Sequence, residues 1–537
     1  MSESGIGRAS AFLASGTIVS RLLGFVKAIV LAQTIGTIGR SADAFAVANQ
    51  LPNNLYVIIA GGVLSAVLVP QIVRASIHPD GGRGYINKLL TITLVIIGGA
   101  TVVAVLIAPV LVTVYAPSWE REQQALATAF AYWCLPQIFF YGLYTVLGEI
   151  LNARKMFGPF TWAPVLNNVV AILGLLGFIA LFGSAANTAR AVTDWTPGMI
   201  ALIGGSATLG VAAQALILFV FWRRAGLSYR PDFAWRGVGL GAAGRLAGWT
   251  FGMLLLTQLA GLVETQVASI ASGDASVTTL QFSWLIFMLP HSVITVSIAT
   301  AYFTRMAEHT RGDDRASLRA DISAAVRVTS LLIVFSAAVL IVVAYPFASL
   351  FTVSYDDIVA MGLIIIAFVL GLVPFCILFV IQRGFYALGD TRTPFFFTLF
   401  QVVLFSGGAL LVGLLLPKVV IGLGIALVMS IAGTAQMVLA WRLLSKRLDG
   451  LESHRIVSSL LRYAIAALPA LFAGFVVLVL TDGVGAGGFG TASFPGAVLC
   501  MTATGATMGI VYFGLLALFR VPELQPVIDP LLARIRR

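Results

Sequence analysis

The stretch SRLLGFVKAIV, residues 20–30, places two cations inside a run that is otherwise suited to a membrane-spanning helix. Apolar and small residues extend from Ala9 to Gly36 with no acidic residue among them. A cation near the bilayer centre costs roughly 2.5–3.5 kcal/mol on insertion scales, and such side chains usually face a cavity or a partner. The stretch therefore predicts a transmembrane helix and marks Arg21 and Lys27 as candidate functional residues.

The rest of the chain is equally apolar. Of its 537 residues, 59% are hydrophobic and only 10% are charged, whereas a soluble domain carries about 25% charged residues. A spanning helix needs about 20 apolar residues, and fourteen segments meet this requirement. They are 9–36, 44–73, 88–116, 125–152, 158–183, 197–222, 246–272, 276–304, 326–350, 357–382, 393–416, 419–441, 460–481 and 495–519. We therefore predict an all-α polytopic membrane protein with 14 transmembrane helices.

The positive charges support this count. If the N-terminus is cytoplasmic, 27 of the 33 Lys and Arg residues fall in inward-facing segments, as the positive-inside rule requires. Only Arg40, Arg121, Arg190 and Lys418 fall in outward-facing loops, and the remaining two are the cations of the first span. Both termini are therefore predicted to be cytoplasmic. The net charge of +11 is explained by membrane topology and contact with anionic lipids, so no nucleic-acid partner is needed.

An internal repeat divides the spans. Leu51-Pro52 in the second span resembles Leu289-Pro290 in the eighth, and the loop at 151–160 resembles the one at 385–396. These offsets agree within a few residues, which indicates two parallel six-helix lobes followed by two further helices. We predict an N-terminal lobe at 1–224, a C-terminal lobe at 225–450, and spans thirteen and fourteen with a cytoplasmic tail at 451–537. Transporters built from such repeats bind substrate between the halves and alternate access.

No motif indicates catalysis. The sequence lacks the P-loop, zinc-hydrolase and nucleophile-elbow patterns, and its two G-x-G-x-x-G matches follow no strand. The three cysteines lie apart in apolar segments, so neither a disulfide framework nor a zinc site is predicted. We therefore predict a protein that is not an enzyme and has no cofactor. Transport without an ATP site must draw on an ion gradient or the membrane potential.

The buried charges are the candidate site. Arg21 lies twelve residues into its span, near the midplane, and Lys27 lies six residues further. Six residues turn a helix by about 600°, so the two cations point about 120° apart unless the helix bends at Gly24. The alternatives are that Lys27 extends to the outer interface and that Arg21 binds carbonyls of a neighbouring helix. Asp43 begins the second span, where a negative charge also interacts favourably with the helix dipole.

Glu264 is the deepest carboxyl in the chain, in the seventh span. From the residues alone it has three roles open to it: a protonated acid, a partner of Arg21, or a cation ligand. A passive buried acid is the alternative to all three.

Several motifs resemble one family. The segments SRLLGFVKAIVLA, SADAFAVANQLPN and LSAVLVPQIV within 16–75, LNARKMFGPFTWAPVLNNVV at 151–170 and RGFYALGDTRTPF at 383–395 resemble the MurJ/MviN flippases of the multidrug/oligosaccharidyl-lipid/polysaccharide exporter superfamily. The resemblance weakens beyond about residue 450.

The resemblance implies a function in cell-wall biogenesis. Such proteins move lipid II, the undecaprenyl-pyrophosphate-linked peptidoglycan precursor, from the inner to the outer leaflet of the bacterial plasma membrane. It implies that Arg21, Lys27, Asp43, Asn53 and Tyr56 contact substrate. It also implies that spans thirteen and fourteen shape a groove for the prenyl tail. Some members are thought to bind sodium between spans seven and eleven, which makes Na⁺ a candidate coupling ion and Glu264 and Ser406 candidates for gating or ion coupling.

The sequence also departs from the family. Ala28, Tyr56 and Leu285 stand where the family often has charged residues, and Gly61 replaces an acid. The resemblance therefore implies a less cationic cavity than in other members. Two alternatives remain: an exporter of another polyprenyl-linked glycan or of drugs, and a non-transporting scaffold that binds cell-wall synthesis proteins.

Overall fold

The computed structural model of the chain describes residues 3–59, 83–154, 156–187, 190–224, 227–234 and 240–525, with the side chains of 3–14, 83 and 240–247 excepted. Helices form all the regular secondary structure of this described part, and the all-α prediction is confirmed. Thirteen of these helical segments are long and apolar enough to span a membrane. They correspond to thirteen of the fourteen predicted spans. The other span, 44–73, begins as α2 and continues outside the described residues, where Gly61 also lies.

The chain forms two compact units, Met1–Gly273 and Asp274–Arg537. The first contains α1 (Glu3–Ile35), α2 (Arg40–Ile59), α4 (Arg83–Leu106), α5 (Ala108–Tyr115), α6 (Arg121–Cys134), α7 (Gln137–Ala153), α8 (Phe157–Phe182), the short η2 (Val192–Asp194), α9 (Pro197–Leu216), α10 (Leu218–Arg224) and α11 (Leu240–Ser269). The seventh span, α11, thus groups with the first six in this structure. The lobes at 1–224 and 225–450 remain a prediction from the repeat.

The second unit begins after α11. It contains α12 (Val277–Pro290), η3 (His291–Thr295), α13 (Val296–Arg311), α14 (Arg315–Val342), α15 (Ala344–Ala348), α16 (Tyr355–Val369), α17 (Leu372–Ala387), α18 (Arg392–Leu415), α19 (Lys418–Arg447), α20 (Ser453–Leu480), α21 (Phe489–Ala492), α22 (Phe494–Leu518) and η4 (Pro522–Leu524).

Several spans are interrupted helices, and two of the breaks show the effect of proline. The span Arg121–Ala153 changes from α6 to α7 at Leu135 and Pro136. The span Val277–Arg311 passes through a π-helical turn directly after Pro290. Proline removes a backbone donor and crowds the preceding turn, which bends a helix. Pro52 lies inside α2, so the repeated Leu-Pro pair falls within the second span of each predicted lobe.

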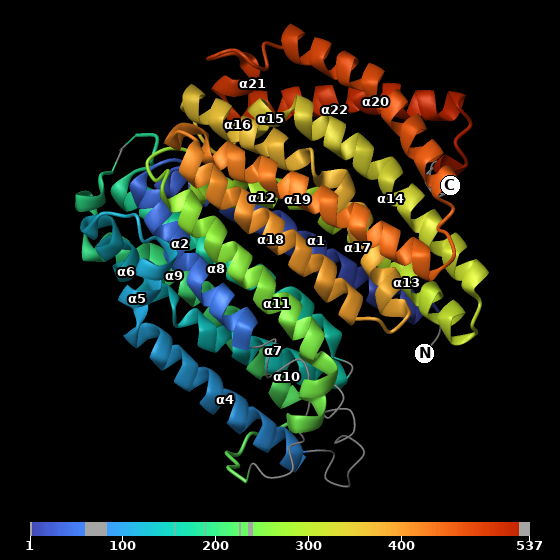
Figure 1. Cartoon of the computed structure of the whole chain (residues 1–537). Coiled ribbons are helices and arrows are strands. Elements are labelled where there is room, and N and C mark those ends of the chain that lie inside the picture. Colours follow the sequence, from blue (N-terminus) through green and yellow to red (C-terminus); the bar gives the residue numbers. More distant parts are fainter. Residues whose placement is uncertain are drawn as a thin grey trace. The chain divides into compact units, whose positions relative to one another are not determined.

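The last two spans pack against α14 within the second unit, as Figure 1 shows for α20 and α22. A cluster of buried side chains, including Leu331, Tyr463, Met508 and Tyr512, fills the space between these helices. The Tyr512 hydroxyl donates to the Leu331 carbonyl oxygen at 2.8 Å. The terminal helices are therefore anchored to one helix of the second unit by both apolar and polar contacts.

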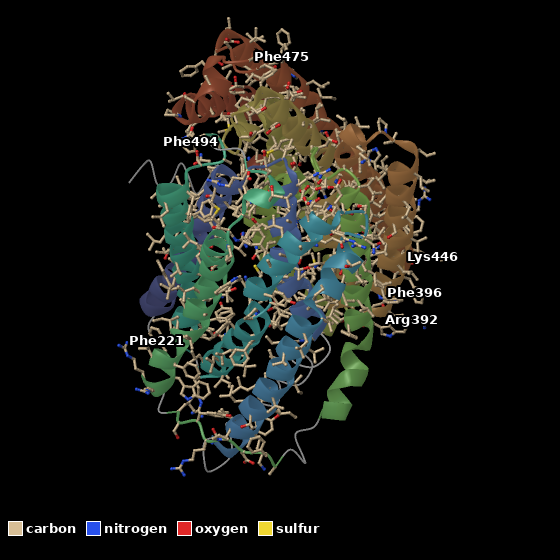
Figure 2. All side chains as sticks on the ribbon, turned by 90° about the vertical axis from the view of Figure 1, so that its left-hand side faces the viewer. Phe221, Arg392, Phe396, Lys446, Phe475 and Phe494 are labelled. Atoms are coloured by element: carbon tan, nitrogen blue, oxygen red, sulfur yellow. The ribbon has the colours of Figure 1, made fainter. Side chains whose placement is uncertain are left out.

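The outer surface of the helices is apolar. Leu414, Leu480 and Ile510 are 79%, 80% and 76% exposed, and Figure 2 shows Phe475 and Phe494 at the surface of the second unit. Exposed apolar residues gathered at this density are uncommon on soluble monomers. In a bilayer the same side chains face acyl chains, which fits a multi-pass membrane protein.

Candidate functional site

The two cations of α1 occupy different environments. The Arg21 side chain is exposed, whereas Lys27 is half-buried and lines a cavity inside the first unit. α1 is one continuous α-helix through Gly24. The angular separation expected from six helical residues therefore persists, and Arg21 is not among the residues that line this cavity.

The cavity has a volume of about 80 Å³, enough for a few water molecules or one small polar group. Its lining combines one cation with neutral polar and apolar side chains from α1, α2, α7, α8 and α9. They are Lys27, Leu31, Phe45, Asn49, Gln137, Tyr141, Asn167, Ala171, Leu175, Ile203, Ser206, Ala207 and Val211. No carboxylate belongs to this set, so among the described residues the Lys27 ammonium is the single formal charge at the cavity wall.

A chain of hydrogen bonds orients the polar wall. The Tyr141 hydroxyl donates to Gln137 Oε1 at 3.1 Å, and Gln137 Nε2 donates to Asn49 Oδ1 at 3.3 Å. Asn167 Nδ2 donates to Gln214 Oε1 at 2.9 Å. The amide oxygens of Gln137 and Asn49 are thus already used as acceptors. Beside Lys27 the lining therefore offers amide N–H donors as well as amide and hydroxyl oxygens, a polar mixture that suits a hydrogen-bonding group.

Close helix packing joins three of the helices that contribute to the cavity wall, α1, α8 and α9. A Cβ added at Gly210 in α9 would lie 2.8 Å from the carbonyl oxygen of Asn167 in α8, too close for any larger residue to fit without movement. Asn168, the next residue of α8, donates from Nδ2 to the Ser20 carbonyl oxygen of α1 at 2.9 Å. Small residues allow membrane helices to approach closely, and here they bring α1, α8 and α9 together.

The other predicted substrate residues are dispersed in the first unit. Asp43 is buried and accepts a hydrogen bond from the Ser272 hydroxyl at 2.8 Å. Asn53 is exposed on α2. Tyr56 is half-buried, and its hydroxyl lies 2.5 Å from Thr145 Oγ1. None of the three lines the Lys27 cavity.

Tyr56 nevertheless connects to that cavity through an aromatic neighbour. Its ring centroid lies 5.6 Å from that of Tyr141, which lines the cavity. Tyr56 stands where the family often has a basic residue, and here its hydroxyl is held by Thr145. The structure therefore places an aromatic and hydrogen-bonded group at this position of α2.

The two candidates for gating or ion coupling belong to different units. Glu264 is half-buried in α11 of the first unit, and Ser406 is half-buried in α18 of the second. Glu264 forms no ion pair with Arg21 or with any other described residue in this structure. Their joint role in coupling remains a prediction. Among the described residues, no group of three or more His, Cys, Asp and Glu side chains is arranged to hold a metal ion.

Sequence reasoning missed the neutral polar residues. Asn49, Gln137 and Asn167 line the cavity, while Ser272 donates to Asp43 and in turn accepts from Gln123. A search for charge in apolar spans does not find amides and hydroxyls. The available signal was the presence of Asn and Gln inside membrane helices, where such side chains usually bond to another helix.

Comparison with known proteins agrees with the motifs. The model of the family described as "Lipid II flippase MurJ" matches residues 31–495. A "Probable lipid II flippase MurJ" of Haemophilus influenzae is 27% identical over 454 residues, which cover 80% of this chain and 84% of that protein. The protein of the same description from Rickettsia prowazekii is 25% identical over 442 residues, with 79% and 81% covered.

Solved structures share the fold. A structure described as "Lipid II flippase MurJ, inward closed conformation" has a TM-score of 0.71 at 19% identity and covers 93% of this chain and 98% of its own. An inward-facing multidrug resistance MATE family transporter has a TM-score of 0.64 at 17% identity, with 81% and 96% covered. At these identities the likeness concerns the fold alone.

Proposed function

The chain belongs to the lipid II flippase MurJ family, a family of transporters and not of enzymes, and we propose that it moves lipid II from the inner to the outer leaflet of the bacterial plasma membrane. Its role would be to supply the peptidoglycan precursor for cell-wall growth. The observation that carries the proposal is the Lys27 cavity, a site inside a membrane-spanning unit whose described lining combines a cation with amide and hydroxyl side chains and includes no carboxylate.

The chemistry of lipid II fits the two cations of α1. A pyrophosphate crossing the hydrocarbon region needs positive charge along its path, because an uncompensated charge there is costly. Arg21 presents an exposed guanidinium, which can bind two phosphate oxygens at once. Lys27 presents an ammonium beside amide donors. In this proposal Arg21 binds the pyrophosphate directly, while Lys27 attracts it electrostatically from the cavity wall.

Asn53 and Tyr56 would assist from α2. The exposed Asn53 amide can donate to a sugar or phosphate oxygen, and Tyr56 supplies an aromatic surface beside Tyr141. Tyr56, which stands where the family often has a basic residue, would thus contact a sugar ring or an amide rather than a phosphate.

Alternating access would be driven by the membrane potential or by an ion gradient, with Na⁺ as the candidate ion and Glu264 and Ser406 as candidate coupling residues. The distribution of Lys and Arg supports an orientation with both termini in the cytoplasm. In that orientation the loop that contains Asp194 is outside the cell and the loop that contains Arg230 is inside.

A second candidate function is export of another polyprenyl-linked glycan or of a drug. The observation that favours it is the fold shared with a MATE transporter. A scaffold for cell-wall synthesis proteins is a third candidate, but two cations within a membrane-spanning helix give a scaffold no advantage that would offset their insertion cost.

Depletion of the protein in its host tests the proposal. We expect lipid II to accumulate in the inner leaflet, where it is protected from an externally added enzyme that cleaves its pyrophosphate. Re-expression of the parent chain should restore cleavage. Normal lipid II exposure combined with altered drug resistance would refute the flippase and favour the exporter. Normal exposure with mislocalised cell-wall synthesis proteins would favour the scaffold.

A further inference from the structure

The end of α11 is held to the start of α2 by a buried hydrogen-bond chain. Ser272 donates from Oγ to the Asp43 carboxylate at 2.8 Å. Gln123 near the start of α6 donates from Nε2 to Ser272 Oγ at 2.7 Å and to the Arg40 carbonyl oxygen at 3.0 Å. The Asp43 and Gln123 residues are only 1% and 3% exposed, so water competes weakly for these bonds. One amide therefore joins the region after α11 to both α2 and α6.

A second set of bonds ties α11 to the end of α5 and to the connection between α5 and α6. Ser269 Oγ lies 2.9 Å from Ser118 Oγ, and the Trp119 indole N–H donates to the Ser269 carbonyl oxygen at 3.1 Å. Gln266 donates from Nε2 to the Val114 carbonyl oxygen at 2.7 Å. These partners are about 150 residues apart in sequence, so the bonds report tertiary packing and not local turn structure.

A third contact lies further along α11. Gln50 Nε2 donates to Thr265 Oγ1 at 3.1 Å. Thr265 and Ser269 are four residues apart and therefore share one face of the helix. This polar face points to α2 and to the end of α5 with the segment that follows it, and α2 and α5 are helices of the first unit that α11 contacts.

The chemistry of these contacts suits repeated opening. Apart from Asp43, every contributing group is neutral, and no ion pair joins α11 to another described segment of the first unit. A neutral hydrogen bond can be exchanged for one to water at small net cost. Breaking a buried ion pair instead leaves an uncompensated charge. The end of α11 is thus fixed in one place by many bonds, of which only the Ser272–Asp43 bond involves a charged group and the others are individually weak.

We propose that Asp43, Ser118, Gln123, Ser269 and Ser272 form a releasable clasp on the end of α11, and that the clasp opens in each transport cycle. In this assignment Asp43 positions α11 through Ser272 and is not a ligand of the substrate. A carboxylate repels pyrophosphate, whereas it is a strong acceptor for a hydroxyl. The inference rests on the proposed function for the identity of the cargo, and it adds the residues that release the helix.

A reversible crosslink tests the clasp. Ser118→Cys and Ser269→Cys are introduced together into full-length protein whose native Cys134, Cys376 and Cys500, all buried and unpaired, are replaced by alanine. After reconstitution in vesicles containing fluorescent lipid II, we expect oxidation to form a disulfide and to reduce flipping at least tenfold. A thiol reductant should restore flipping, and each single-cysteine variant should respond to neither reagent.

Two results would overturn the proposal: failure of the folded double variant to crosslink, or parental flipping by the crosslinked protein. If the cysteine-free parent moves no lipid II at all, the proposed function fails, and crosslink yield alone decides whether the contact exists. The outcomes of the two proposals are therefore distinguishable.

Substitutions at the clasp separate positioning from substrate binding. Ser272→Ala and Asp43→Ala should both change turnover several-fold, with little change in the lipid II concentration that gives half-maximal rate. Asp43→Asn keeps an acceptor oxygen for Ser272 and should retain most of the parental turnover. An Asp43→Ala variant that raises the half-maximal concentration, beside a Ser272→Ala variant that behaves as the parent, would make Asp43 a substrate ligand and refute the clasp.

Discussion

Arg327 and Glu523 lie 196 residues apart in the sequence and form an ion pair in the interior of the second unit. Their side chains are only 10% and 6% exposed. Arg327 belongs to α14 and Glu523 to η4, which directly follows the last span. The pair therefore fixes the end of the fourteenth span against the ninth, beside the apolar cluster that holds α20 and α22.

Removing one partner of this pair should destabilise the protein strongly. Glu523→Ala leaves a buried guanidinium unpaired, and we expect a loss of about 3–5 kcal/mol in unfolding free energy. The double variant Arg327→Met/Glu523→Leu should recover most of the loss, because it removes both charges. Thermal unfolding in detergent measures both. The matched control is Glu452→Ala, which breaks the exposed pair with Arg455 and should cost at most about 1 kcal/mol.

The two cations of α1 should differ in how they tolerate exchange. Arg21→Ala should abolish complementation of a flippase-depleted strain while the protein still reaches the membrane, and Arg21→Lys should be partly active because the charge remains. Lys27→Ala should also reduce activity, since it removes the only formal charge among the described residues that line its cavity. Arg455→Ala, at an exposed site, is the control. A fully active Arg21→Ala variant would make Arg21 structural at most.

Gly210 should not accept a side chain. Gly210→Ala places a Cβ 2.8 Å from the Asn167 carbonyl oxygen, and we expect overpacking to cost about 1–3 kcal/mol. The control is Gly177→Ala in α8, where a Cβ meets no atom within 4 Å and where alanine favours the helix. Thermal unfolding should separate the two variants. Equal stability would show that α8 and α9 adjust freely.

Asp390 should make stability depend on pH in the acid range. It lies in the loop between α17 and α18. Although partial burial opposes this, bonds from the Thr393 backbone and hydroxyl, together with the nearby Arg447, lower the pKa of its carboxyl. A lowered folded-state pKa stabilises the protein above the unfolded value of about 3.9, and that stabilisation is lost as pH falls through the folded pKa.

We therefore expect Asp390→Asn to be less stable than the parent at pH 7 and to approach it below about pH 4, because the parent loses its advantage there. Melting temperatures in detergent across this window measure the difference. Thr393→Val, which removes only the hydroxyl bond, should fall between them. A constant difference between Asp390→Asn and the parent at every pH would contradict the assigned cause.

Replacing Glu264 should change ion coupling or gating more than the affinity for lipid II. If it holds a coupling cation, Glu264→Gln should remove the dependence of flipping on that cation. If it biases the conformational equilibrium, Glu264→Gln should change turnover at any sodium concentration. Flipping measured with and without sodium, and with the membrane potential collapsed, separates the two results. Ser406→Ala, tested in parallel, should follow Glu264→Gln only if both residues serve the same ion. Parental behaviour under every condition would make Glu264 a passive buried acid.

The amino-acid sequence determined the class of fold and the family. Each residue partitions between water and lipid largely by its own chemistry. Runs of about 20 apolar residues, and the excess of Lys and Arg in inward-facing loops, can therefore be recognised without a structure. Thirteen of the fourteen predicted spans are found in the described residues for this reason. The cations of α1 were equally visible, because a charge inside an apolar run stands out wherever it points.

Only the tertiary structure decided what these residues face. It turned Lys27 toward a cavity and Arg21 toward an exposed surface, and it gave Asp43 a partner 229 residues away in Ser272. It also grouped α11 with the first six spans. Such pairings depend on neutral hydroxyls and amides whose partners are set by helix packing. A single helix contains no information about which neighbour will meet its polar face, so only the assembled fold determines it.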